Sequence, residues 1–335
     1  MTDADASLIA TREGAGDKPV GRLLMNRPRA LNALDLPMID GFAAAIAAWR
    51  DDPTLRLVLL EGAGDRAFCA GGDVRQVRQQ VLDGDRAAVD AFFSREYAVN
   101  GGIAAFPQPW ISLIDGICMG GGLGVSVHGS HRIVTEHALL AMPETAIALF
   151  PDVGTSYVLP RLPGGLGRWI ALTGARLKGA EAVEAGLATH YVPREKLPAL
   201  RQALLANGDA RIVDDFAEAV PPGRIAALRP AIDRCFAHDD RAAIEAALEA
   251  EATDWAAEQL AILKRVSPTS VAVTLELLKR GGTLDLPGCL EQELVLTRTV
   301  TQHPDFAEGV RAVLVDKDQA PKWQPVADMK EMFED

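Results

Sequence analysis

Short apolar runs separated by glycine-rich loops dominate the N-terminal part of the chain. Leu55–Leu60 and Trp110–Ile114 are almost wholly apolar, and Arg132–Thr135 continues the pattern. Runs of this length beside Gly clusters are typical of buried strands that lead into loops, and a continuous apolar run fits a parallel strand covered on both faces. We also predict strands at Leu8–Thr11 and Val20–Met25, joined by the Gly-rich turn GAGD.

Helical spacing of apolar residues appears between these runs. Asp35 stands where an N-cap would begin a helix over Leu36–Trp49. A second helical stretch is predicted from about Asp73 and over Val74–Ala105, with breaks at Gly84 and at the pair Gly101-Gly102. Strand, glycine loop and helix recur three times, which predicts right-handed βαβ units and an α/β fold.

The composition changes beyond about Lys196. Ala, Leu and Glu then dominate, and long amphipathic patterns follow, as in Arg241–Leu263 and Ser270–Lys279. We therefore predict a core over residues 1–205 that holds the active site, and a mostly helical C-terminal region over residues 206–335.

Composition excludes several classes of function. The formal net charge of −12 argues against a nucleic-acid partner, which would require a basic surface. The four cysteines include no CxxC pair and the histidines show no HExxH spacing, so we expect reduced, buried thiols and no metal site. No apolar run approaches the ~20 residues of a membrane span, and the acidic N-terminus lacks the apolar stretch of a secretory signal. We expect a soluble, cytoplasmic protein with no membrane partner.

Candidate chemistry lies between Trp110 and Gly154. The strand Trp110–Ile114 is followed by the triplet Gly120-Gly121-Gly122, and glycines at such a place let backbone N–H groups approach a ligand closely. Two carboxylates, Glu144 in MPET and Asp152 in FPDVG, stand in apolar sequence. Burying a charge without a partner is unfavourable, so these acids are candidates for functional groups.

Four longer motifs occur in order: AFCAGGD (Ala67 to Asp73), DGICMGGG (Asp115 to Gly122), MPETAIALFPDVG (Met142 to Gly154) and the tail DFAEGVRAVLVDKDQAPKW. Together they resemble the crotonase superfamily, and more narrowly its 3-hydroxyisobutyryl-CoA hydrolase branch. One glycine motif alone would be weak evidence, but the ordered set extends from about Ser7 to Trp323. The resemblance implies a crotonase-type spiral of ββα units followed by a helical C-terminal region.

The resemblance also implies a catalytic set. Backbone N–H groups of Ala70 and Gly121 would hold the thioester oxygen as negative charge develops on it, and Glu144 would face the carbonyl. Asp152 would orient Glu144, the water or the substrate hydroxyl. Structural alternatives exist for each: the two glycine loops could only make tight turns, Glu144 could only favour a helix dipole, and Asp152 could only cap a helix.

The reaction type depends on a missing acid. In the hydratases of the superfamily a second glutamate follows the GGG motif, and in dienoyl-CoA isomerases an aspartate takes its place; here the position is Gly124. The resemblance therefore favours hydrolysis of a short branched 3-hydroxyacyl-CoA such as 3-hydroxyisobutyryl-CoA, as in valine breakdown. A thiol leaves readily, since its reference pKa is about 8.5, so a nucleophile or base and an oxyanion hole suffice. The alternatives are an enoyl-CoA hydratase or isomerase, and a non-catalytic acyl-CoA-binding protein.

Substrate contacts are expected from the same motifs. Glu96 matches a substrate-contacting glutamate of the branch and could hold the 3-hydroxyl, although it could equally be a solvated acid on a helix. Arg27 and Arg29 could meet the phosphates of coenzyme A. Further expected contacts lie in the two glycine loops, at Gly71, Gly72, Asp73 and Gly120. Coenzyme A is part of the substrate, so no separate cofactor is expected, and whether the chain forms a homo-oligomer is left open.

Overall fold

The computed structural model describes residues 6–14 and 18–333 and divides them between two compact units. The first unit comprises the chain up to Gly72 together with Ala98–Leu140 and Leu177–Ile225. The second comprises Asp73–Tyr97, Ala141–Arg176 and the chain from Ala226 onward. The chain thus passes repeatedly from one unit to the other, and the division expected at residue 206 falls inside a helix of the first unit, α8.

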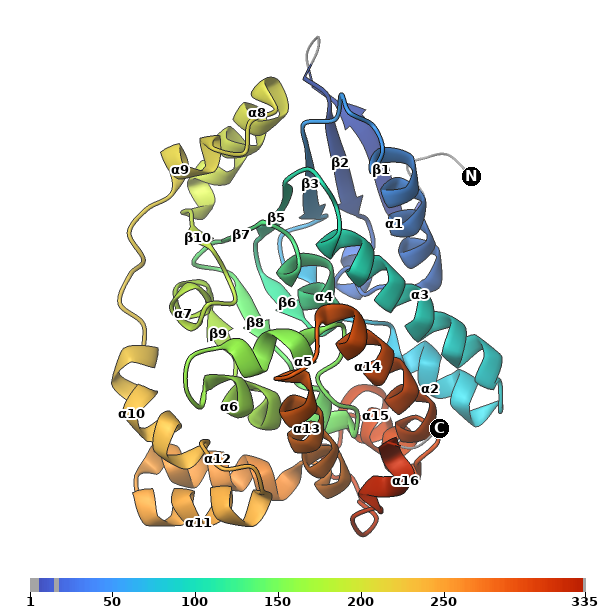
Figure 1. Ribbon diagram of the computed structural model, residues 1–335, viewed down its shortest axis with the longest axis vertical. Coiled ribbons are helices and arrows are strands. Elements are labelled where there is room, and N and C mark those ends of the chain that lie inside the picture. The colour runs from blue at the N-terminus through green and yellow to red at the C-terminus, as the bar shows by residue number, and fades with distance from the viewer. Residues whose placement is uncertain (1–5, 15–17, 334–335) are drawn as a thin grey trace. The chain divides into compact units, whose positions relative to one another are not determined.

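A six-stranded sheet forms the centre of the first unit, in the order β1-β2-β3-β5-β7-β10 (Figure 1). Its strands are β1 (Leu8–Glu13), β2 (Val20–Met25), β3 (Leu57–Gly62), β5 (Trp110–Ile114), β7 (His131–Val134) and β10 (His190–Tyr191). β1 and β2 are antiparallel and all the other neighbours are parallel. The predicted strands are confirmed, while most of the turn expected between β1 and β2 lies outside the described residues.

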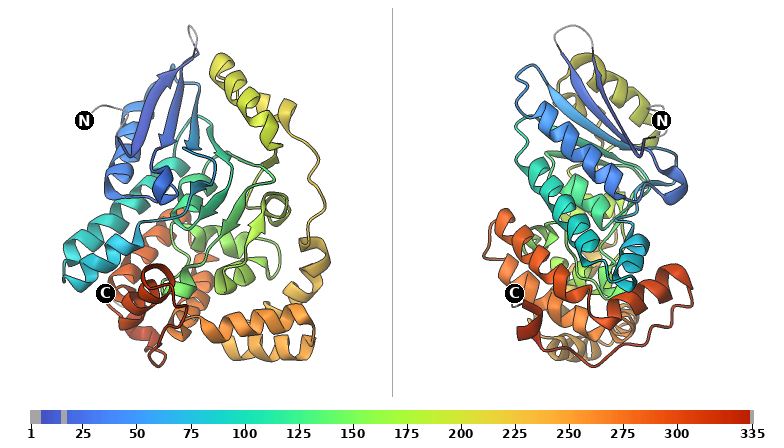
Figure 2. Two further views of the ribbon diagram at one scale, coloured as in Figure 1. Left: turned by 180° about the vertical axis from the view of Figure 1, so that it is seen from behind. Right: turned by 90° about the vertical axis from the view of Figure 1, so that its right-hand side faces the viewer.

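Helices cover both faces of this sheet. Successive residues of a strand point to opposite faces. Val20 packs in a buried cluster with Leu200 and Leu204 of α8 (Leu197–Asn207), and its neighbour Gly21 faces the ring of Trp49 in α1 (Leu36–Trp49). The side view in Figure 2 accordingly has α1 and α8 on opposite sides of the strands. α1 has the predicted bounds, because Asp35 accepts the Met38 backbone N–H at 2.9 Å as its N-cap.

A second, four-stranded sheet in the order β4-β6-β8-β9 carries the glycine loops. Its strands are β4 (Ala67–Cys69), β6 (Ile117–Met119), β8 (Leu139–Ala141) and β9 (Leu177–Lys178). β4 and β6 are parallel neighbours, so their carboxyl ends lie at the same edge. The remaining helices of this unit are α4 (Gly121–Val127), α7 (Gly179–Ala185) and α9 (Ile212–Phe216).

The described part of the second unit is almost entirely helical. Its N-terminal helices are α2 (Val74–Leu82) and the start of α3 (Arg86–Ala104), and its middle section holds η3 (Glu144–Ile147), α5 (Thr155–Val158) and α6 (Leu166–Thr173). The C-terminal part supplies α10 (Ile225–Cys235), α11 (Arg241–Glu251), α12 (Asp254–Arg265), α13 (Pro268–Gly281), α14 (Leu286–Val300), α15 (Pro304–Val310) and α16 (Met329–Phe333). The predicted helical C-terminal region is therefore confirmed.

One helix prediction was wrong, and one long amphipathic pattern contains two helices. α3 continues through Gly101-Gly102 instead of breaking there, and a Cβ on Gly102 would come within 3.2 Å of the Ile46 side chain. Glycine at this position lets α3 approach α1 closely, which explains why it is tolerated inside the helix. The pattern over Arg241–Leu263 divides into α11 and α12, because Ala252 adopts a left-handed φ of 52° that ends the first helix.

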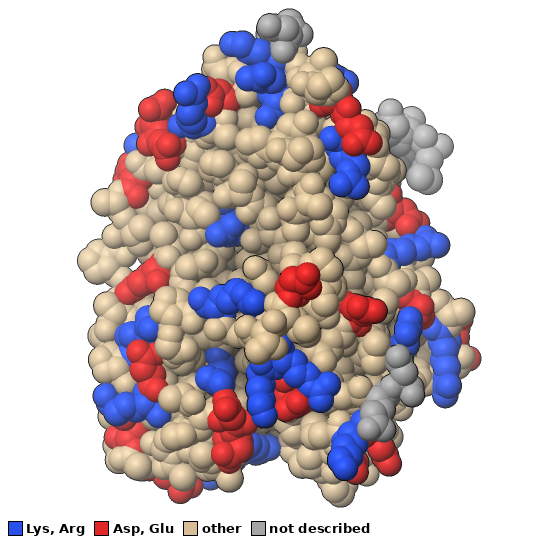
Figure 3. All heavy atoms as spheres, viewed as in Figure 1, with Lys and Arg blue, Asp and Glu red and all other residues tan. Residues whose placement is uncertain are grey.

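The surface shows no segregation of charge on the face drawn in Figure 3, where acidic and basic side chains are interspersed. All four cysteines are buried and lie outside disulfide bonds, as expected. Among the described residues, no helix has the length and apolar character needed to cross a membrane.

Candidate active site

The two glycine loops meet in the first unit. Gly71 has a φ of 104°, which favours glycine, and a Cβ added there would lie 3.2 Å from the Met119 carbonyl oxygen and 3.7 Å from the Gly121 backbone nitrogen. A Cβ on Gly122 would come within 2.4 Å of the Cys69 carbonyl oxygen. The loops that follow β4 and β6 are thus in close contact because glycine occupies these positions.

The backbone N–H of Ala70 does not fit the predicted role of an oxyanion donor. It donates to the Leu31 carbonyl at 3.0 Å, so its proton is already engaged. The Gly71 carbonyl accepts the Leu34 N–H at 2.9 Å. In a trans peptide the next N–H points away from that carbonyl, so the Gly72 N–H is directed away from residues 31–34. The prediction of Ala70 is therefore corrected in favour of Gly72.

Gly121 retains its predicted geometry. Gly120, with a φ of 47°, precedes α4, and Gly121 is the first residue of that helix. The N–H of a first helical residue has no acceptor within its own helix. Among the described residues, the backbone hydrogen bonds of loops, turns and caps include none donated by the N–H of Gly121 or of Gly72. One unit therefore presents two open backbone donors on adjoining loops.

Four acids gather in the second unit, and three of them were predicted. Glu144 opens η3, Asp152 precedes α5, Glu96 lies on α3, and Glu293 lies on α14. All four are buried, with at most 6% of each residue exposed. No positive charge is among the causes that shift their pKa values; the charges that act on them are those of one another.

Burial and mutual repulsion keep these acids protonated to unusually high pH. Burial, and then the charge of Asp152, hold the pKa values of Glu144 and Glu96 well above their usual range. Burial also raises the pKa of Asp152 to about 6, although the hydroxyl of Tyr97, which donates to Asp152 Oδ2 at 2.8 Å, opposes the rise. Burial and the charge of Asp152 raise the pKa of Glu293 to about 8.

Two carboxyl oxygens in this cluster have no protein partner. Among the described residues, Glu144 Oε2 and Glu96 Oε1 are buried without a hydrogen bond. Buried polar atoms nearly always have a hydrogen-bond partner, so two carboxyl oxygens without one in the same cluster require an explanation. Both oxygens are free to meet a water molecule or a substrate hydroxyl.

The turn that carries Glu144 is fixed by helices from the C-terminal part of the chain. The Ser267 N–H, at the start of α13, donates to the Thr145 carbonyl at 3.2 Å, and the Ser270 hydroxyl donates to the Leu149 carbonyl. A Cβ on Gly309 of α15 would lie 2.6 Å from the backbone of Ile147, so that helix also presses on η3. The acid is therefore set by tertiary contacts and not by its local sequence alone.

The other predicted contact residues have varied surroundings. Arg27 is engaged within its own unit, where its Nε lies 3.1 Å from Asp35 Oδ2 and its Nη1 donates to the Ala33 carbonyl at 2.6 Å. Arg29 is exposed, and Asp73 precedes α2. That either arginine contacts the phosphates of coenzyme A stays a prediction. Arg29 takes no part in the contacts that Arg27 makes with Asp35 and Ala33.

Sequence reasoning missed Glu293 and Tyr97. In α14 the buried positions are Cys289, Leu290, Glu293, Leu296, Thr297 and Val300, so an acid occupies the apolar stripe of an amphipathic helix. That position was the available signal. Tyr97 follows Glu96 directly and gives no comparable signal, because a buried tyrosine in a helix is usual.

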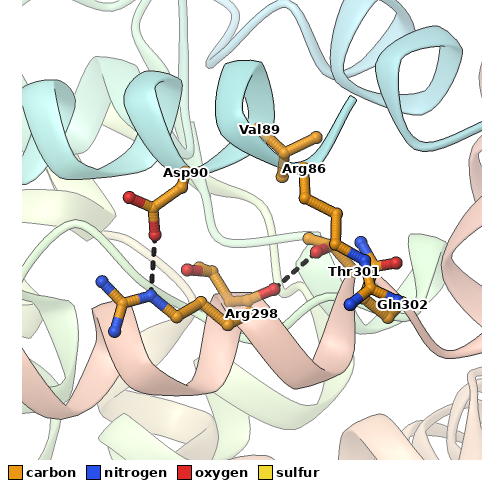
Figure 4. A pocket seen from close by; sticks show the side chains of 7 residues that line it. Arg86, Val89, Asp90, Arg298, Thr301 and Gln302 are labelled. Atoms are coloured by element: carbon orange, nitrogen blue, oxygen red, sulfur yellow. Dashed lines mark hydrogen bonds and ion pairs between the residues drawn. The ribbon is translucent and has the colours of Figure 1, made fainter. Parts of the chain in front are cut away.

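A separate hollow of about 280 Å³ lies between α3 and α14 (Figure 4). It is lined by Arg86, Val89, Asp90, Thr297, Arg298, Thr301 and Gln302. Asp90 and Arg298 form an ion pair of 2.7 Å across it. None of the predicted site residues lines this hollow, and within the described residues no cluster suited to a metal ion is present.

The chain belongs to the enoyl-CoA hydratase/isomerase family, whose model matches residues 20–334. The fold is the crotonase fold: a carnitinyl-CoA dehydratase from Mycobacterium thermoresistibile superposes with a TM-score of 0.93 at 38% identity, over 99% of this chain and 97% of that one. An enoyl-CoA hydratase from Rhodobacter sphaeroides 2.4.1 gives a TM-score of 0.88 at 40% identity, over 97% and 96%.

Particular relatives narrow the family to one branch. The mitochondrial 3-hydroxyisobutyryl-CoA hydrolase of Xenopus tropicalis is 43% identical over 97% of this chain and 86% of its own length. The human protein of the same name is 41% identical over 100% and 88%. The family resemblance stated from the motifs is confirmed. The expected cytoplasmic location is wrong by this comparison, because these relatives are named as mitochondrial.

Proposed function

We propose that this chain hydrolyses the thioester bond of a short, branched 3-hydroxyacyl-CoA, with 3-hydroxyisobutyryl-CoA, an intermediate of valine breakdown, as its substrate. The observation that carries this proposal is Glu144, a buried acid with an unpaired Oε2 and a raised pKa. A carboxylate whose pKa is raised is a stronger base once ionised, which suits proton transfer from water. The names of the curated relatives support the choice of substrate.

The reaction needs an ionised Glu144. In one route Glu144 takes a proton from water while the water oxygen bonds to the thioester carbon. The carbonyl oxygen becomes negative, and the N–H groups of Gly72 and Gly121 stabilise it. The carbon–sulfur bond then breaks, and the thiolate of coenzyme A leaves and takes a proton from Glu144. Each backbone donor of this kind typically contributes about 10²–10³ in rate.

In the other route the Glu144 carboxylate attacks the carbon itself, the carbon–sulfur bond breaks and the thiolate of coenzyme A leaves; water then cleaves the mixed anhydride that has formed. A single turnover in ¹⁸O-labelled water, with enzyme in excess, separates the routes. Direct attack by water places ¹⁸O in the first product formed. In the anhydride route, water attacks the Glu144 carbonyl carbon. The first product then carries an oxygen from Glu144, and the ¹⁸O label enters the Glu144 side chain.

Asp152 and Glu96 complete the proposal. Asp152, held by the Tyr97 hydroxyl, orients Glu144 or the attacking water. Glu96, whose Oε1 is buried without a partner, accepts or donates a hydrogen bond to the 3-hydroxyl of the substrate. Replacing Glu96 by Gln should therefore reduce the preference for 3-hydroxyisobutyryl-CoA over isobutyryl-CoA, which lacks that hydroxyl, and an unchanged preference would remove Glu96 from this role.

The decisive test is Glu144→Gln in an assay of thiol release from 3-hydroxyisobutyryl-CoA. We expect kcat to fall by about 10²–10⁴, the usual contribution of a general base, while calorimetry still detects thioester binding. Glu181→Gln is the matched control, because Glu181 is also buried and hydrogen-bonded, through the Lys178 N–H and Arg224. Turnover retained by Glu144→Gln would exclude Glu144 from the mechanism.

A hydratase or dehydratase acting on an enoyl-CoA is the second candidate, because the two solved structures compared above carry such names. Gly124 argues against it, since it offers no acid where the hydratases of the superfamily have one. Loss of the conjugated absorbance of crotonyl-CoA without thiol release would support the hydratase. Binding of the thioester without either signal would indicate a non-catalytic protein.

A further inference from the structure

The turn that follows Asp152 has an unfavourable backbone. Val153 and Gly154 both adopt left-handed conformations, with φ angles of 54° and 78°. Glycine accepts this region readily, but a β-branched residue rarely does. A residue held in such a region is typically unfavourable and persists only when its surroundings determine it. Some group outside the turn must therefore stabilise it.

Glu293, on α14, contacts this turn directly. Its carboxylate accepts the Gly154 N–H at 2.7 Å, the Ser156 N–H at 3.2 Å and the Ser156 hydroxyl. The residue is fully buried on α14, and its partners lie 137 to 139 residues earlier in the chain. The N–H groups of Gly154 and Ser156, two residues apart, form a concave donor site, and the Glu293 side chain fills it.

The same turn fixes Asp152. Its carbonyl oxygen accepts the Thr155 N–H at 2.9 Å and the Thr155 hydroxyl at 2.8 Å, so its backbone cannot move without the residues that Glu293 holds. Its carboxylate is fixed separately by the Tyr97 hydroxyl. The position of the Asp152 side chain therefore depends on both contacts, one from α3 and one, through the turn, from α14.

We propose that Glu293 is a positioning residue, which holds the turn over residues 152–156 so that Asp152 keeps the orientation required for thioester hydrolysis; this role in catalysis rests on the proposed function. A carboxyl group suits this position because both of its oxygens can accept a hydrogen bond from the three partners, whether or not one oxygen carries a proton. A glutamine at the position has one acceptor oxygen and an amide group that donates, so it cannot satisfy them together.

The experiment compares Glu293→Gln with the wild-type chain by hydrogen–deuterium exchange and by steady-state kinetics. We expect amide exchange in peptides covering residues 153–157 to accelerate at least tenfold, because the amide nitrogen of glutamine cannot accept the N–H that a carboxyl oxygen accepts. We expect kcat for 3-hydroxyisobutyryl-CoA to fall by about 10- to 100-fold with KM within about twofold, since a misplaced group affects the reacting geometry more than binding. Glu181→Gln should leave exchange in this segment and both kinetic constants unchanged.

Ser156→Ala removes one donor and keeps the acid, so it provides a milder variant if Glu293→Gln does not fold; exchange should accelerate in the same segment by a smaller factor. Unchanged exchange there in a folded Glu293→Gln chain would overturn the proposal, and so would an unchanged kcat. A wild-type chain that releases no thiol from any thioester would overturn the proposed function instead. Accelerated exchange in the variant would then still support the hold of Glu293 on the turn.

Discussion

The protonation of Glu293 gives a prediction about stability that does not depend on catalysis. Its pKa is about 8 in the folded chain, against an ordinary value of 4.5, because burial and the charge of Asp152 disfavour the ionised form. Between these two pH values the folded chain keeps a proton that the unfolded chain has released. The contribution of Glu293 to stability is therefore greatest at low pH and decreases as the pH rises towards 8.

The size of the effect follows from the same two values. One pH unit corresponds to about 1.4 kcal/mol for one proton, so Glu293 alone should lower the free energy of unfolding by about 4 kcal/mol between pH 5 and pH 8. Glu293→Gln does not titrate but leaves at least one buried donor unsatisfied, which is unfavourable by about 1–3 kcal/mol. The wild-type chain should therefore be more stable at pH 5 and the variant more stable at pH 8, so that the two curves cross.

Urea unfolding followed by far-ultraviolet circular dichroism, in half-unit steps from pH 5 to pH 8.5, measures both curves. Glu181→Gln serves as the control for removal of a buried, hydrogen-bonded carboxylate from another helix. If the difference between wild type and Glu293→Gln stayed constant across this range, Glu293 would be ionised throughout and the reasoning from its burial would be refuted.

Two glycine substitutions test the packing around the site. Gly122→Ala places a Cβ 2.4 Å from the Cys69 carbonyl oxygen, so it should separate the two glycine loops and lower kcat more than tenfold. The control is Gly41→Ala, whose Cβ meets only the flexible Leu8 side chain at 3.1 Å and which should retain activity. Equal activity of the two variants would count against close contact of the loops. Gly281→Ala places a Cβ 2.1 Å from the Ser156 carbonyl oxygen and should reduce stability by about 1–3 kcal/mol in thermal unfolding. Gly282→Ala, with its nearest atom at 3.4 Å, should be nearly neutral, and a matching loss there would show that crowding is not the cause.

Local features of the chain were predictable because they depend on neighbouring residues. The bounds of α1 follow from the Asp35 cap and the apolar spacing after it, and the bounds of β2 and β5 follow from their apolar runs. The motifs that identified the family also located Glu144, Asp152 and Gly121. These predictions needed no knowledge of which segments lie side by side.

The errors arose where distant residues decide the outcome. The engagement of the Ala70 N–H depends on the Leu31 carbonyl, and the continuity of α3 through Gly101-Gly102 depends on Ile46 of another helix. Glu293 was missed because its partners are more than 130 residues away. In each case the neighbouring sequence indicates only a local conformational preference, while a tertiary contact determines the conformation or hydrogen bond that is observed.

The residues that contact the Glu144 turn, Ser267, Ser270 and Gly309, lie late in the chain. Glu293, which accepts hydrogen bonds from the turn after Asp152, also lies late in the chain, on α14. During synthesis on the ribosome these segments emerge long after the two acids. A nascent chain that ends before α13 lacks these contacts, so the acids are then less buried than in the folded chain. The raised pKa values of the acids should therefore be complete only after the last 70 or so residues have been made.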